Sequence, residues 1–587
     1  MRHLIRALWR LLTPAERRSS LWLGLLMLAT GAIEVSGLIS VVPLVAVLTS
    51  SVDPCARLGQ TAGRLCAQAL PSRDPYVLGG LAFVLIATSN LLAFAVAWLS
   101  ARLAFAVWQR VATNLFNNYI ERPYEYFFRV HSSEVVKNVA LETERFAHLV
   151  FMPMLVLVSR AVITAAVIAL VLVVDASVSI VVVAFMGGLY AFVYRRLQGR
   201  MRRSGQLALA ARTRISNITT ETIGGIREVR MLACESYFAD KFARSSSTLA
   251  REYLYGVVVS VLPRYIIETT AFVLMLGLAV YLHRALGDWQ AAAPLLAFYV
   301  FTAYRLLPQF QQIYANAMAI QQNAVVVDTL GELLLAPPLV HATEQLPSSA
   351  QGEKDLRPPI RVRDVTYRYA GVDRPVLSSA NMEIPARATV GLVGATGAGK
   401  STIIDLIAGL LYPTQGTVEV NGVPLDDRLA ISWRRRIGYV PQVLFLLDDS
   451  IRRNIAFGLD DPAISQQEVE RAARAANIHD FIASLPEGYD TLVGERGVRF
   501  SGGQRQRLVI ARALYRDPEV LIFDEATSAL DQETEQAVMD AIGTLSHQKT
   551  LFIISHRPAT LQGCDLVYEV ADGKINLHKP GALRSSA

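Results

Sequence analysis

The stretch Gly394-Ala-Thr-Gly-Ala-Gly-Lys400-Ser401 has the spacing G-x-x-x-x-G-K-S and decides the fold of the C-terminal part of the chain. It lies between an apolar run, 389–393, that is typical of a buried strand and a run, 402–411, that is typical of a helix. Glycines in such a turn let backbone N–H groups converge on phosphate oxygens, and the following helix adds the positive end of its dipole. A glycine-rich turn without a ligand is the alternative, but a Lys-Ser pair at the helix start favours a phosphate site.

Two side chains of this turn are suited to a nucleoside triphosphate and its metal ion. The Lys400 ammonium can reach the β- and γ-phosphates, and the Ser401 hydroxyl can ligate Mg²⁺. The stretch therefore predicts that the chain binds a nucleoside triphosphate together with Mg²⁺.

A second informative stretch, 499–507, contains Phe500-Ser-Gly-Gly-Gln504. It is followed by Val520-Leu-Ile-Phe-Asp524-Glu525, in which four apolar residues precede two carboxylates. Such a run is typical of a buried strand that brings acids to its C-terminal end, where α/β folds place their ligands. Asp524 is suited to the Mg²⁺ shell, and Glu525 to a base that polarises an attacking water.

Together these stretches resemble the nucleotide-binding domain of ABC transporters, with its Walker A, signature and Walker B motifs in order. The signature departs from the usual Leu-Ser-Gly-Gly-Gln only at Phe500. The resemblance implies ATP as the nucleotide and catalytic roles for Glu525, for Gln442 as a γ-phosphate sensor and for His556 as the switch histidine. It implies the metal ligands Ser401, Gln442 and Asp524. It also implies a D-loop at 528–531, a cross-dimer loop around Glu495, and the ATP-binding residues Tyr369 (stacked on adenine), Gly394, Thr396, Gly397, Gly399, Lys400, Ser401, Thr402, Ser501, Gly502, Gly503 and Gln504.

The resemblance also bears on assembly. In ABC transporters, ATP lies between the Walker A motif of one domain and the signature motif of another, so one nucleotide-binding domain cannot complete a site alone. Both motif sets of this chain are intact, Glu525 included. We therefore expect a homodimer with two competent sites, and a heterodimer with a degenerate partner is the alternative.

The N-terminal part of the chain has a different composition. Hydrophobic residues make up 52% of the whole sequence, and the excess lies before residue 330. Six stretches are long and apolar enough to cross a bilayer, which takes roughly 20 residues each: 21–48, 76–101, 149–174, 178–193, 256–282 and 291–313. Six buried helices of a large soluble domain are the alternative, but uncharged runs such as 161–174 argue against it.

Basic residues predict the orientation of these spans. The segment before the first span and the connection between the fourth and fifth are rich in arginine, whereas the turn near Asp175 has none. The positive-inside rule therefore places the N-terminus, the long connections and the ATPase in the cytosol, with the spans in the inner (plasma) membrane. These flanks also account for the formal charge of +7, so nucleic-acid binding is not needed to explain it.

The predicted fold is a multidomain membrane protein, with an all-α six-helix transmembrane domain followed by an α/β P-loop ABC ATPase domain. We expect the transmembrane domain, with an interfacial helix over the first 20 residues, at 1–330, a linker at 331–358 and the nucleotide-binding domain at 359–587. Cys55 and Cys66 share the one substantial external loop, where either a disulfide or two free thiols would be consistent with the sequence.

Two cytosolic connections are expected to link the domains. Pro123-Tyr-Glu-Tyr-Phe-Phe128, followed by His131-Ser-Ser-Glu134, resembles the first coupling helix of exporter-type ABC transporters, whose aromatic residues would dock beside Gln442. A second coupling helix is expected within 206–221. ATP binding would close the nucleotide domains, and these segments would convert the closure into alternating access.

Charges inside spans are costly and usually functional, and here they are Glu34, Arg160, Arg264, Glu268 and Arg305. If Arg264 and Arg305 face a central cavity, they would favour an anionic substrate head. An Arg264–Glu268 pair that only stabilises helix packing is the alternative.

The substrate is less well indicated than the ATPase. Over its full length the chain resembles lipid-linked oligosaccharide flippases, which implies an amphipathic substrate leaving the cytoplasmic leaflet and makes a lipid-linked saccharide the first hypothesis. A small modified peptide or another lipid or glycolipid is the alternative. A nucleotide-gated channel is disfavoured by the presence of Glu525 and His556, and a soluble ABC ATPase is disfavoured by the six spans.

Overall fold

The computed structural model describes residues 6, 9–49, 74–174, 176–286, 289–335, 356–494, 497–525, 543, 545–555, 561 and 563–578. The chain divides into two compact units. Unit 1 comprises Met1–Glu121 and Val130–Pro338, and unit 2 comprises Arg122–Arg129 and Leu339–Ala587. The division between predicted domains, with a linker at 331–358, stays a prediction because most of that linker lies outside the described residues, as do Cys55 and Cys66.

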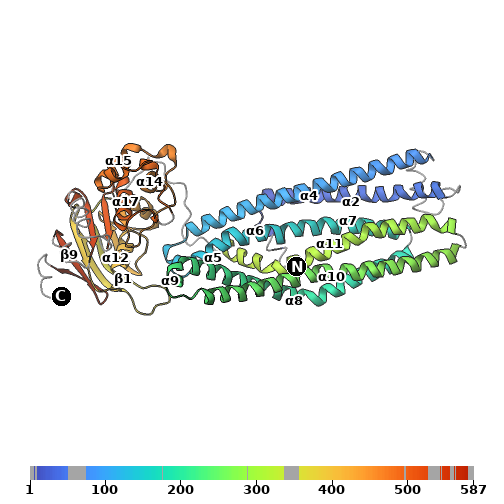
Figure 1. Cartoon of the computed structure of the whole chain (residues 1–587), viewed down its shortest axis with the longest axis horizontal. Helices are drawn as coiled ribbons and strands as arrows, with labels where there is room; N and C mark the ends of the chain where they lie inside the picture. The colour runs from blue at the N-terminus through green and yellow to red at the C-terminus, as the bar shows by residue number, and fades with distance from the viewer. Residues whose placement is uncertain are drawn as a thin grey trace. The chain divides into compact units, whose positions relative to one another are not determined.

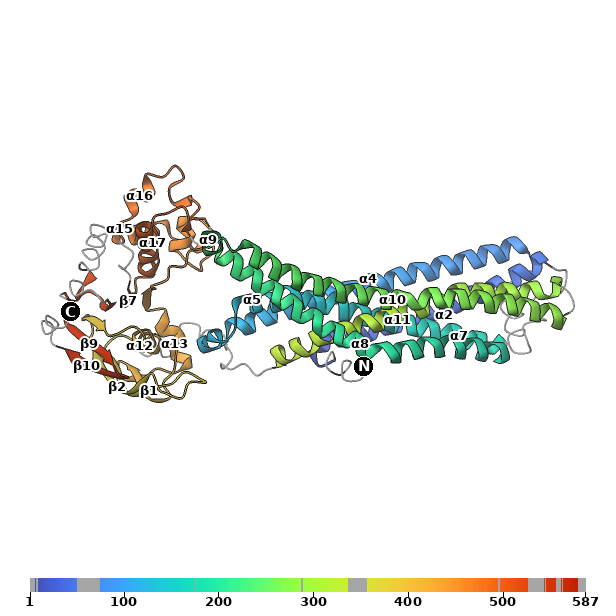
Figure 2. The same cartoon turned by 60° about the horizontal axis from the view of Figure 1, so that its bottom comes forward.

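Long helices form unit 1 and lie lengthwise beside one another in both views (Figures 1 and 2). Six of the helices in the described part exceed 20 residues: α2 (Pro14–Thr49), α4 (Pro75–Ile120), α7 (Met152–Val174), α8 (Ala176–Gly224), α10 (Glu235–Leu286) and α11 (Trp289–Leu335). Helix α4 begins with a cap, because the Asp74 side chain accepts a hydrogen bond from the backbone N–H of Tyr76 and Pro75 fits the first turn.

Shorter elements join α4 to α7 and follow α8. They are η1 (Tyr124–Phe128), α5 (Ser132–Val136), η2 (Lys137–Glu142), α6 (Thr143–Phe146), η3 (Ala147–Phe151) and α9 (Ile226–Met231). Segments η2 and η3 are π-helical turns, and they flank a buried ionic group in which Glu142 lies 2.8 Å from Arg145 and 3.6 Å from Arg212. A buried carboxylate needs such partners, because an isolated charge in the protein interior is strongly destabilising.

Four candidate membrane spans are found among the described residues: Pro14–Gly37, Tyr76–Ile120, Ser132–Val173 and Glu235–Arg284. They contain the second and fifth predicted spans and overlap the first, which is predicted to reach residue 48, and the third, which is predicted to reach residue 174. The fourth and sixth predicted spans lie in α8 and α11, where part of the sequence is outside the described side chains. Helix α11 packs against α2, α7, α8 and α10, so it is surrounded by the other long helices.

Three helices, α8, α10 and α11, approach closely around Gln322 of α11. A Cβ atom on Gly205 of α8 would collide with the backbone carbonyl of Gln322 on α11, and one on Gly256 of α10 would lie 2.5 Å from the Gln322 amide. The Gln322 Nε2 atom donates to the backbone carbonyl of Glu252 at 3.2 Å. Gly205 therefore allows α8 to pack directly on the backbone of α11, and Gly256 makes room on α10 for the Gln322 side chain.

Unit 2 is built on two sheets. A four-stranded antiparallel sheet has the order β2-β1-β4-β5, with β1 (Ile360–Tyr367), β2 (Leu377–Ile384), β4 (Gln415–Val420) and β5 (Val423–Pro424). A six-stranded sheet has the order β10-β9-β3-β8-β7-β6, with β3 (Thr389–Val393), β6 (Ile437–Val440), β7 (Val520–Asp524), β8 (Thr550–Ile554), β9 (Leu566–Ala571) and β10 (Lys574–His578). All pairings of the larger sheet are parallel except β9 with β10.

The parallel register brings the predicted site residues to one edge. Leu392 of β3 pairs with Ile554 of β8, and Ile554 also pairs with Asp524 of β7. The three strands therefore end at the same level, and the residues directly after them lie together at the C-terminal edge of the sheet, where α/β folds bind ligands. Strands β7 and β8 are buried along their whole length, as expected for central strands covered on both faces.

Helices pack around these sheets in two groups, each with its own apolar core. Helices α12 (Lys400–Ile407) and α13 (Asp427–Arg434) pack with the strands, and Trp433 is fully buried, with its indole N–H donating to the carbonyl of Ile407 at 2.7 Å. A helical group lies beside strand β7 (Figure 2). It consists of α14 (Ile451–Ile455), η4 (Asp461–Ala463), α15 (Gln466–Ala475), α16 (His479–Ala483), η5 (Gly488–Asp490) and α17 (Gly502–Tyr515).

Candidate nucleotide site

The turn between β3 and α12 has the backbone of a phosphate cradle. Gly394, Gly397 and Gly399 have φ angles of 150°, 81° and 107°, which side chains rarely allow. A Cβ on Gly394 would also collide with the backbone carbonyl of Val570. Helix α12 starts directly after this turn, so its N-terminal N–H groups point toward the space where phosphates would lie.

The Lys400 side chain folds back and bonds to the backbone of its own turn. Its ammonium donates to the carbonyls of Gly394 at 2.8 Å and Ala395 at 3.0 Å. Burial lowers the pKa of Lys400, and the nearby carboxylates of Glu525 and Asp524 oppose that shift. The lysine and both acids are therefore close enough to interact electrostatically, as expected of residues that share one site.

The aromatic residue expected to stack on a base is tied to the same helix. The Tyr369 hydroxyl lies 3.0 Å from the Thr402 hydroxyl of α12. Its ring meets the ring of Tyr367 edge to face, with centroids 5.0 Å apart. Tyr369 thus lies beside the cradle in an orientation set by both contacts, although it is 33 positions from Thr402 in the sequence.

The two acids at the end of β7 have different environments. Asp524 is buried and accepts a hydrogen bond from the Tyr439 hydroxyl at 3.2 Å. The pKa of Asp524 is raised, mainly by burial and also by the nearby Glu525 carboxylate. The hydrogen bond from Tyr439 and the charge of Lys400 oppose this shift only in part. A divalent cation would relieve this clustering of negative charge, so the residues present fit the Mg²⁺ that the sequence predicts.

Glu525 turns away from the strand in a left-handed conformation, with a φ of 47°. Its backbone N–H donates to the carbonyl of Ile554 at 3.1 Å, and its carboxylate accepts a hydrogen bond of 2.5 Å from the Gln442 side chain. A non-glycine residue in this conformation is uncommon and tends to occur at functional sites. The structure therefore places Gln442 and Glu525, which lie 83 positions apart, in direct contact.

The signature motif caps helix α17. Ser501 is the N-cap, and its hydroxyl accepts from the backbone N–H of Gln504 at 3.3 Å while the Gln504 side chain accepts from the backbone N–H of Ser501 at 2.9 Å. This reciprocal capping box starts the helix at Gly502. Ser501 itself is exposed, so a helix N-terminus with a hydroxyl is presented to solvent.

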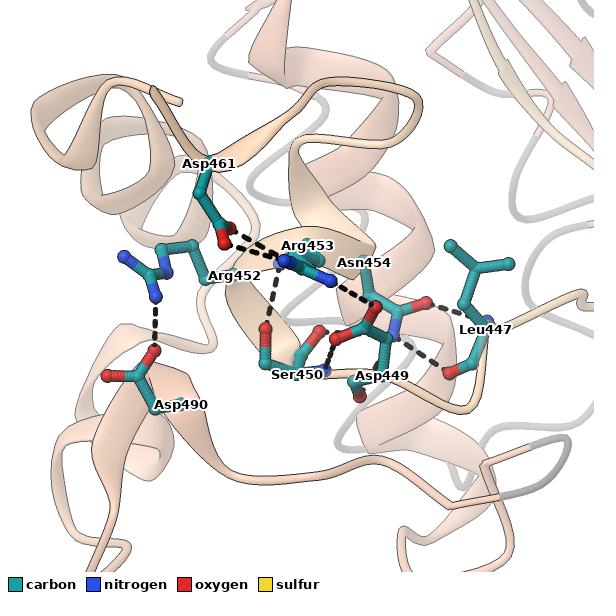
Figure 3. A network of polar contacts seen from close by, with 8 residues as sticks. All are labelled: Leu447, Asp449, Ser450, Arg452, Arg453, Asn454, Asp461 and Asp490. Atoms are coloured by element: carbon teal, nitrogen blue, oxygen red, sulfur yellow. Dashed lines mark hydrogen bonds and ion pairs between the residues drawn. The ribbon is translucent and has the colours of Figure 1, made fainter. Parts of the chain in front are cut away.

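A polar network holds the segment between Gln442 and the signature helix (Figure 3). Asn454 bonds both backbone groups of Leu447, and Arg453 pairs with Asp449 at 3.1 Å and Asp461 at 2.5 Å. From α17, Arg512 donates to the carbonyls of Asn454 at 2.8 Å and Phe445 at 2.6 Å.

Arg512, Asn454 and Tyr439 did not emerge as site residues from the sequence. These three residues belong to no recognisable sequence motif, and only the fold brings them close to the site. Burial lowers the pKa of Arg512 to about 10, which still leaves it charged at neutral pH and able to hold both carbonyls.

Several predicted site residues lie outside the described part of the chain. They are His556, the cross-dimer Glu495 and the D-loop segment 528–531. The catalytic, ATP-binding and metal-binding roles of Glu525, Gln442, Ser401 and the other predicted residues stay predictions, because the structure shows where the described side chains lie and not what they bind.

The charged residues of the spans form two ion pairs on the described helices. Arg264 and Glu268 of α10 are 2.7 Å apart, with 47% and 46% of their side chains exposed. Arg305 of α11 lies 2.6 Å from Glu34 of α2, with 29% and 5% exposed. The alternative pairing of Arg264 with Glu268 is therefore present, whereas the partner of Arg305, on a different helix, could not be inferred from spacing.

Comparison with known proteins agrees with this architecture. Residues 61–304 match the family of ABC transporter transmembrane regions, and residues 377–528 match the ABC transporter family. A protein of Aromatoleum aromaticum named ATP-dependent lipid A-core flippase is 30% identical over 81% of this chain and 77% of its own length. A protein of Saccharophagus degradans with the same name is 33% identical over 62% of this chain and 60% of its own length.

A solved bacterial Atm1-family ABC exporter with ATP bound has a TM-score of 0.76 at 23% identity and covers 96% of this chain and 95% of its own length. That likeness concerns the fold. The chain belongs to the ABC transporter family, as a transmembrane region fused to an ATPase domain in one polypeptide. It is accordingly a membrane-embedded ABC transporter that uses ATP. The predicted fold class is confirmed.

Proposed function

We propose that this protein flips an amphipathic lipid with an anionic saccharide head out of the cytoplasmic leaflet of the inner membrane. The similarity to proteins named lipid A-core flippases supports this class of substrate. The alternatives, a small modified peptide or another glycolipid, are outcomes of the test below.

The observation that carries the proposal is a cluster of charges on α2, α7 and α11. Arg305 pairs with the buried Glu34, and Arg160 donates to the Gln309 side chain at 3.3 Å. Arg160 is attracted by Glu34 and repelled by Arg305, so the three ions belong to one electrostatic group. Two guanidinium groups and one carboxylate leave an excess of one positive charge per chain within this group.

An excess cation within a span is costly unless something compensates it. A phosphate or carboxylate on a lipid head would do so, and guanidinium groups bind such anions through paired hydrogen bonds. Apolar residues such as Ile163, Val167 and Leu306 cluster around α7 and α11, which suits the acyl chains of the same molecule. In this proposal Arg305 binds the anionic head, which is one hypothesis from the sequence, and Arg160 takes the place of Arg264 as the second arginine.

ATP hydrolysis would be carried out by the residues at the C-terminal edge of the large sheet. Lys400 and the N–H groups of the cradle bind the phosphates, Tyr369 supports the base, and Gln442 orients Glu525. Glu525 accepts the proton of the attacking water. When bound by Ser401, Gln442 and Asp524, Mg²⁺ neutralises charge on the phosphates.

The exposed Ser501 supports a homodimer as the working form. Because the signature N-terminus is presented to solvent in one chain, a second copy would supply it to the phosphates of the first. Two identical chains would then form two complete sites.

The test is ATPase activity of the full-length protein in proteoliposomes that contain lipid A-core, a neutral glycolipid or a small cationic peptide. We expect lipid A-core to stimulate turnover severalfold, and Arg160→Gln to remove the stimulation while basal turnover persists. Arg284→Gln, at the end of α10, is the matched control and should keep it. Stimulation by the peptide or the neutral glycolipid alone would contradict the proposal and favour those substrates.

A further inference from the structure

The segment Arg122–Arg129 interrupts the helices of unit 1 and belongs to unit 2. It forms the 3₁₀ turn η1, Tyr124–Phe128, with no buried residue of its own. Its Glu125 carboxylate accepts a hydrogen bond of 2.5 Å from the Tyr367 hydroxyl at the end of β1. A phenol and a carboxylate 242 positions apart are therefore bonded within one compact unit.

The same segment contacts the predicted base-stacking ring. Phe128 meets Tyr369 at a centroid distance of 5.6 Å and an interplanar angle of 72°, and Tyr124 meets Phe128 at 4.8 Å and 74°. Tyr367 contacts Tyr369 from another direction, also edge to face. Tyr369 is thus held by two rings, and each of these is fixed by the η1 segment.

The hydrogen bond from the Tyr367 hydroxyl to the Glu125 carboxylate joins a phenol to an acidic side chain. Burial raises the pKa of Tyr367, and Glu125 adds to that shift, so the phenol keeps its proton at neutral pH and can donate it. A hydrogen bond with an ionised acceptor is shorter and stronger than one between neutral groups. It links Tyr367 to η1 and so limits the movement of the Tyr367 ring against Tyr369.

We propose that Glu125 and Phe128 are positioning residues for the nucleotide base, because they hold Tyr367 and Tyr369 in the orientation in which Tyr369 stacks on a purine. In this arrangement the η1 segment fixes the ring that contacts the base, whereas the β3–α12 turn contacts the phosphates. Base recognition is then coupled, through the covalent chain, to the helices α4 and α5 that flank the segment.

Binding linkage makes this coupling reciprocal: if η1 stabilises the ring for the base, a bound base stabilises η1 to the same extent. Removing the Glu125–Tyr367 hydrogen bond should weaken only those ligands that carry a base. A ligand made of phosphates alone should be unaffected, since the cradle around Lys400 does not include η1.

The test uses full-length protein in nanodiscs without transported substrate, so it does not depend on the identity of that substrate. The KM for ATP reports base and phosphates together, and the inhibition constant of inorganic tripolyphosphate reports the phosphate cradle alone. We expect Glu125→Ala and Tyr367→Phe each to raise the KM roughly fivefold, a scale of about 1 kcal/mol, with kcat and the tripolyphosphate constant within twofold of wild type. The double variant should match either single variant, because both remove the same bond.

Two further variants separate positioning from folding. Glu125→Gln keeps a side-chain oxygen as acceptor and should restore most of the ATP affinity. Tyr412→Phe removes another phenol–carboxylate hydrogen bond of unit 2, the one to Asp427, and should leave the KM unchanged. Three outcomes would each overturn the proposal. The KM for ATP and the tripolyphosphate inhibition constant could shift equally in a variant, the effects of Glu125→Ala and Tyr367→Phe on the KM could add in the double variant, or the KM could stay unchanged in Glu125→Ala.

Discussion

At the scale of single residues, the conformation of Glu525 matters most. The left-handed backbone directs its side chain away from the line of β7 and toward Gln442, while Asp524 stays buried at the end of the strand. Adjacent acids in an extended strand would point to opposite faces. The left-handed turn at Glu525 ends this alternation, and the two neighbouring carboxylates have different partners, Tyr439 for Asp524 and Gln442 for Glu525.

Glu525→Gln should slow ATP turnover by roughly 10²–10⁴-fold, the usual range for loss of a general base. The amide keeps the size of the side chain, so ATP binding should persist. Lys400→Ala should instead abolish binding, because it removes the cation of the cradle. Steady-state turnover and equilibrium binding of labelled ATP check both; turnover of Glu525→Gln within a few-fold of wild type would remove Glu525 from the proposed role.

A pH dependence is expected from Asp405 of α12. Burial, with Asp524 as a second cause, raises the pKa of Asp405 from 3.8 to about 6 in the folded protein. Between these values the folded state binds more protons than the unfolded state, so this group lowers stability as pH rises from about 4 to 6 and changes little above. Asp405→Asn should therefore unfold at a higher temperature than wild type, with a gap that widens up to pH 6 and then stays level. Thermal unfolding of the nucleotide-free full-length protein at several pH values measures this, and a gap independent of pH would contradict it.

At the scale of elements, short contacts decide how long helices pack. Helix α17 begins with the capping box of Ser501 and Gln504, and its position depends on Arg512, which holds the carbonyls of two residues from the preceding segment. In unit 1, Gly205 lets α8 reach the backbone of α11 at Gln322, and Gly256 of α10 makes room for the Gln322 side chain. Capping can be predicted from four neighbouring residues, whereas helix contacts of this kind depend on residues far apart in the sequence.

Gly205→Ala should destabilise the protein, since the new methyl group collides with the Gln322 carbonyl and such overpacking costs about 1–3 kcal/mol. Gly199 lies on the same helix with open space around its Cβ position, so Gly199→Ala should be neutral or stabilising by up to about 1 kcal/mol through helix propensity. Thermal unfolding of both variants in the same detergent provides the comparison. Equal effects would show that α8 and α11 do not approach as described.

At the scale of the whole molecule, the two intramembrane ion pairs are expected to differ. The Glu34–Arg305 pair joins two helices and buries its carboxylate, whereas the Arg264–Glu268 pair lies on one helix with both side chains half exposed. Removing one partner of a buried pair leaves an uncompensated charge and costs about 3–5 kcal/mol. An exposed pair of this spacing contributes only about 0–1 kcal/mol.

Arg305→Gln alone should thus lower thermal stability, and Glu34→Gln combined with Arg305→Gln should restore it. The double variant should still lose stimulation by an anionic lipid, because the cation is gone. Arg264→Gln with Glu268→Gln is the control and should keep both stability and stimulation. Unfolding temperatures and lipid-stimulated ATPase of the three proteins distinguish these roles; full stimulation in the Glu34–Arg305 double variant would exclude Arg305 from substrate binding.

Local features of this protein could be predicted from the sequence alone. The β3–α12 cradle, the capped signature helix, the acids that end β7 and the apolar spans each depend on residues close together in the chain, so spacing and residue type were enough. Contacts between distant side chains depended on the fold. Gln442 meets Glu525, Tyr439 meets Asp524, and Glu34 meets Arg305. Glu125 and Phe128 meet the Tyr367–Tyr369 pair, and the predicted docking of this segment beside Gln442 stays a prediction. The physical reason is that hydrogen bonds and ion pairs act over a few ångströms, and only strand register and helix packing bring such groups within that range.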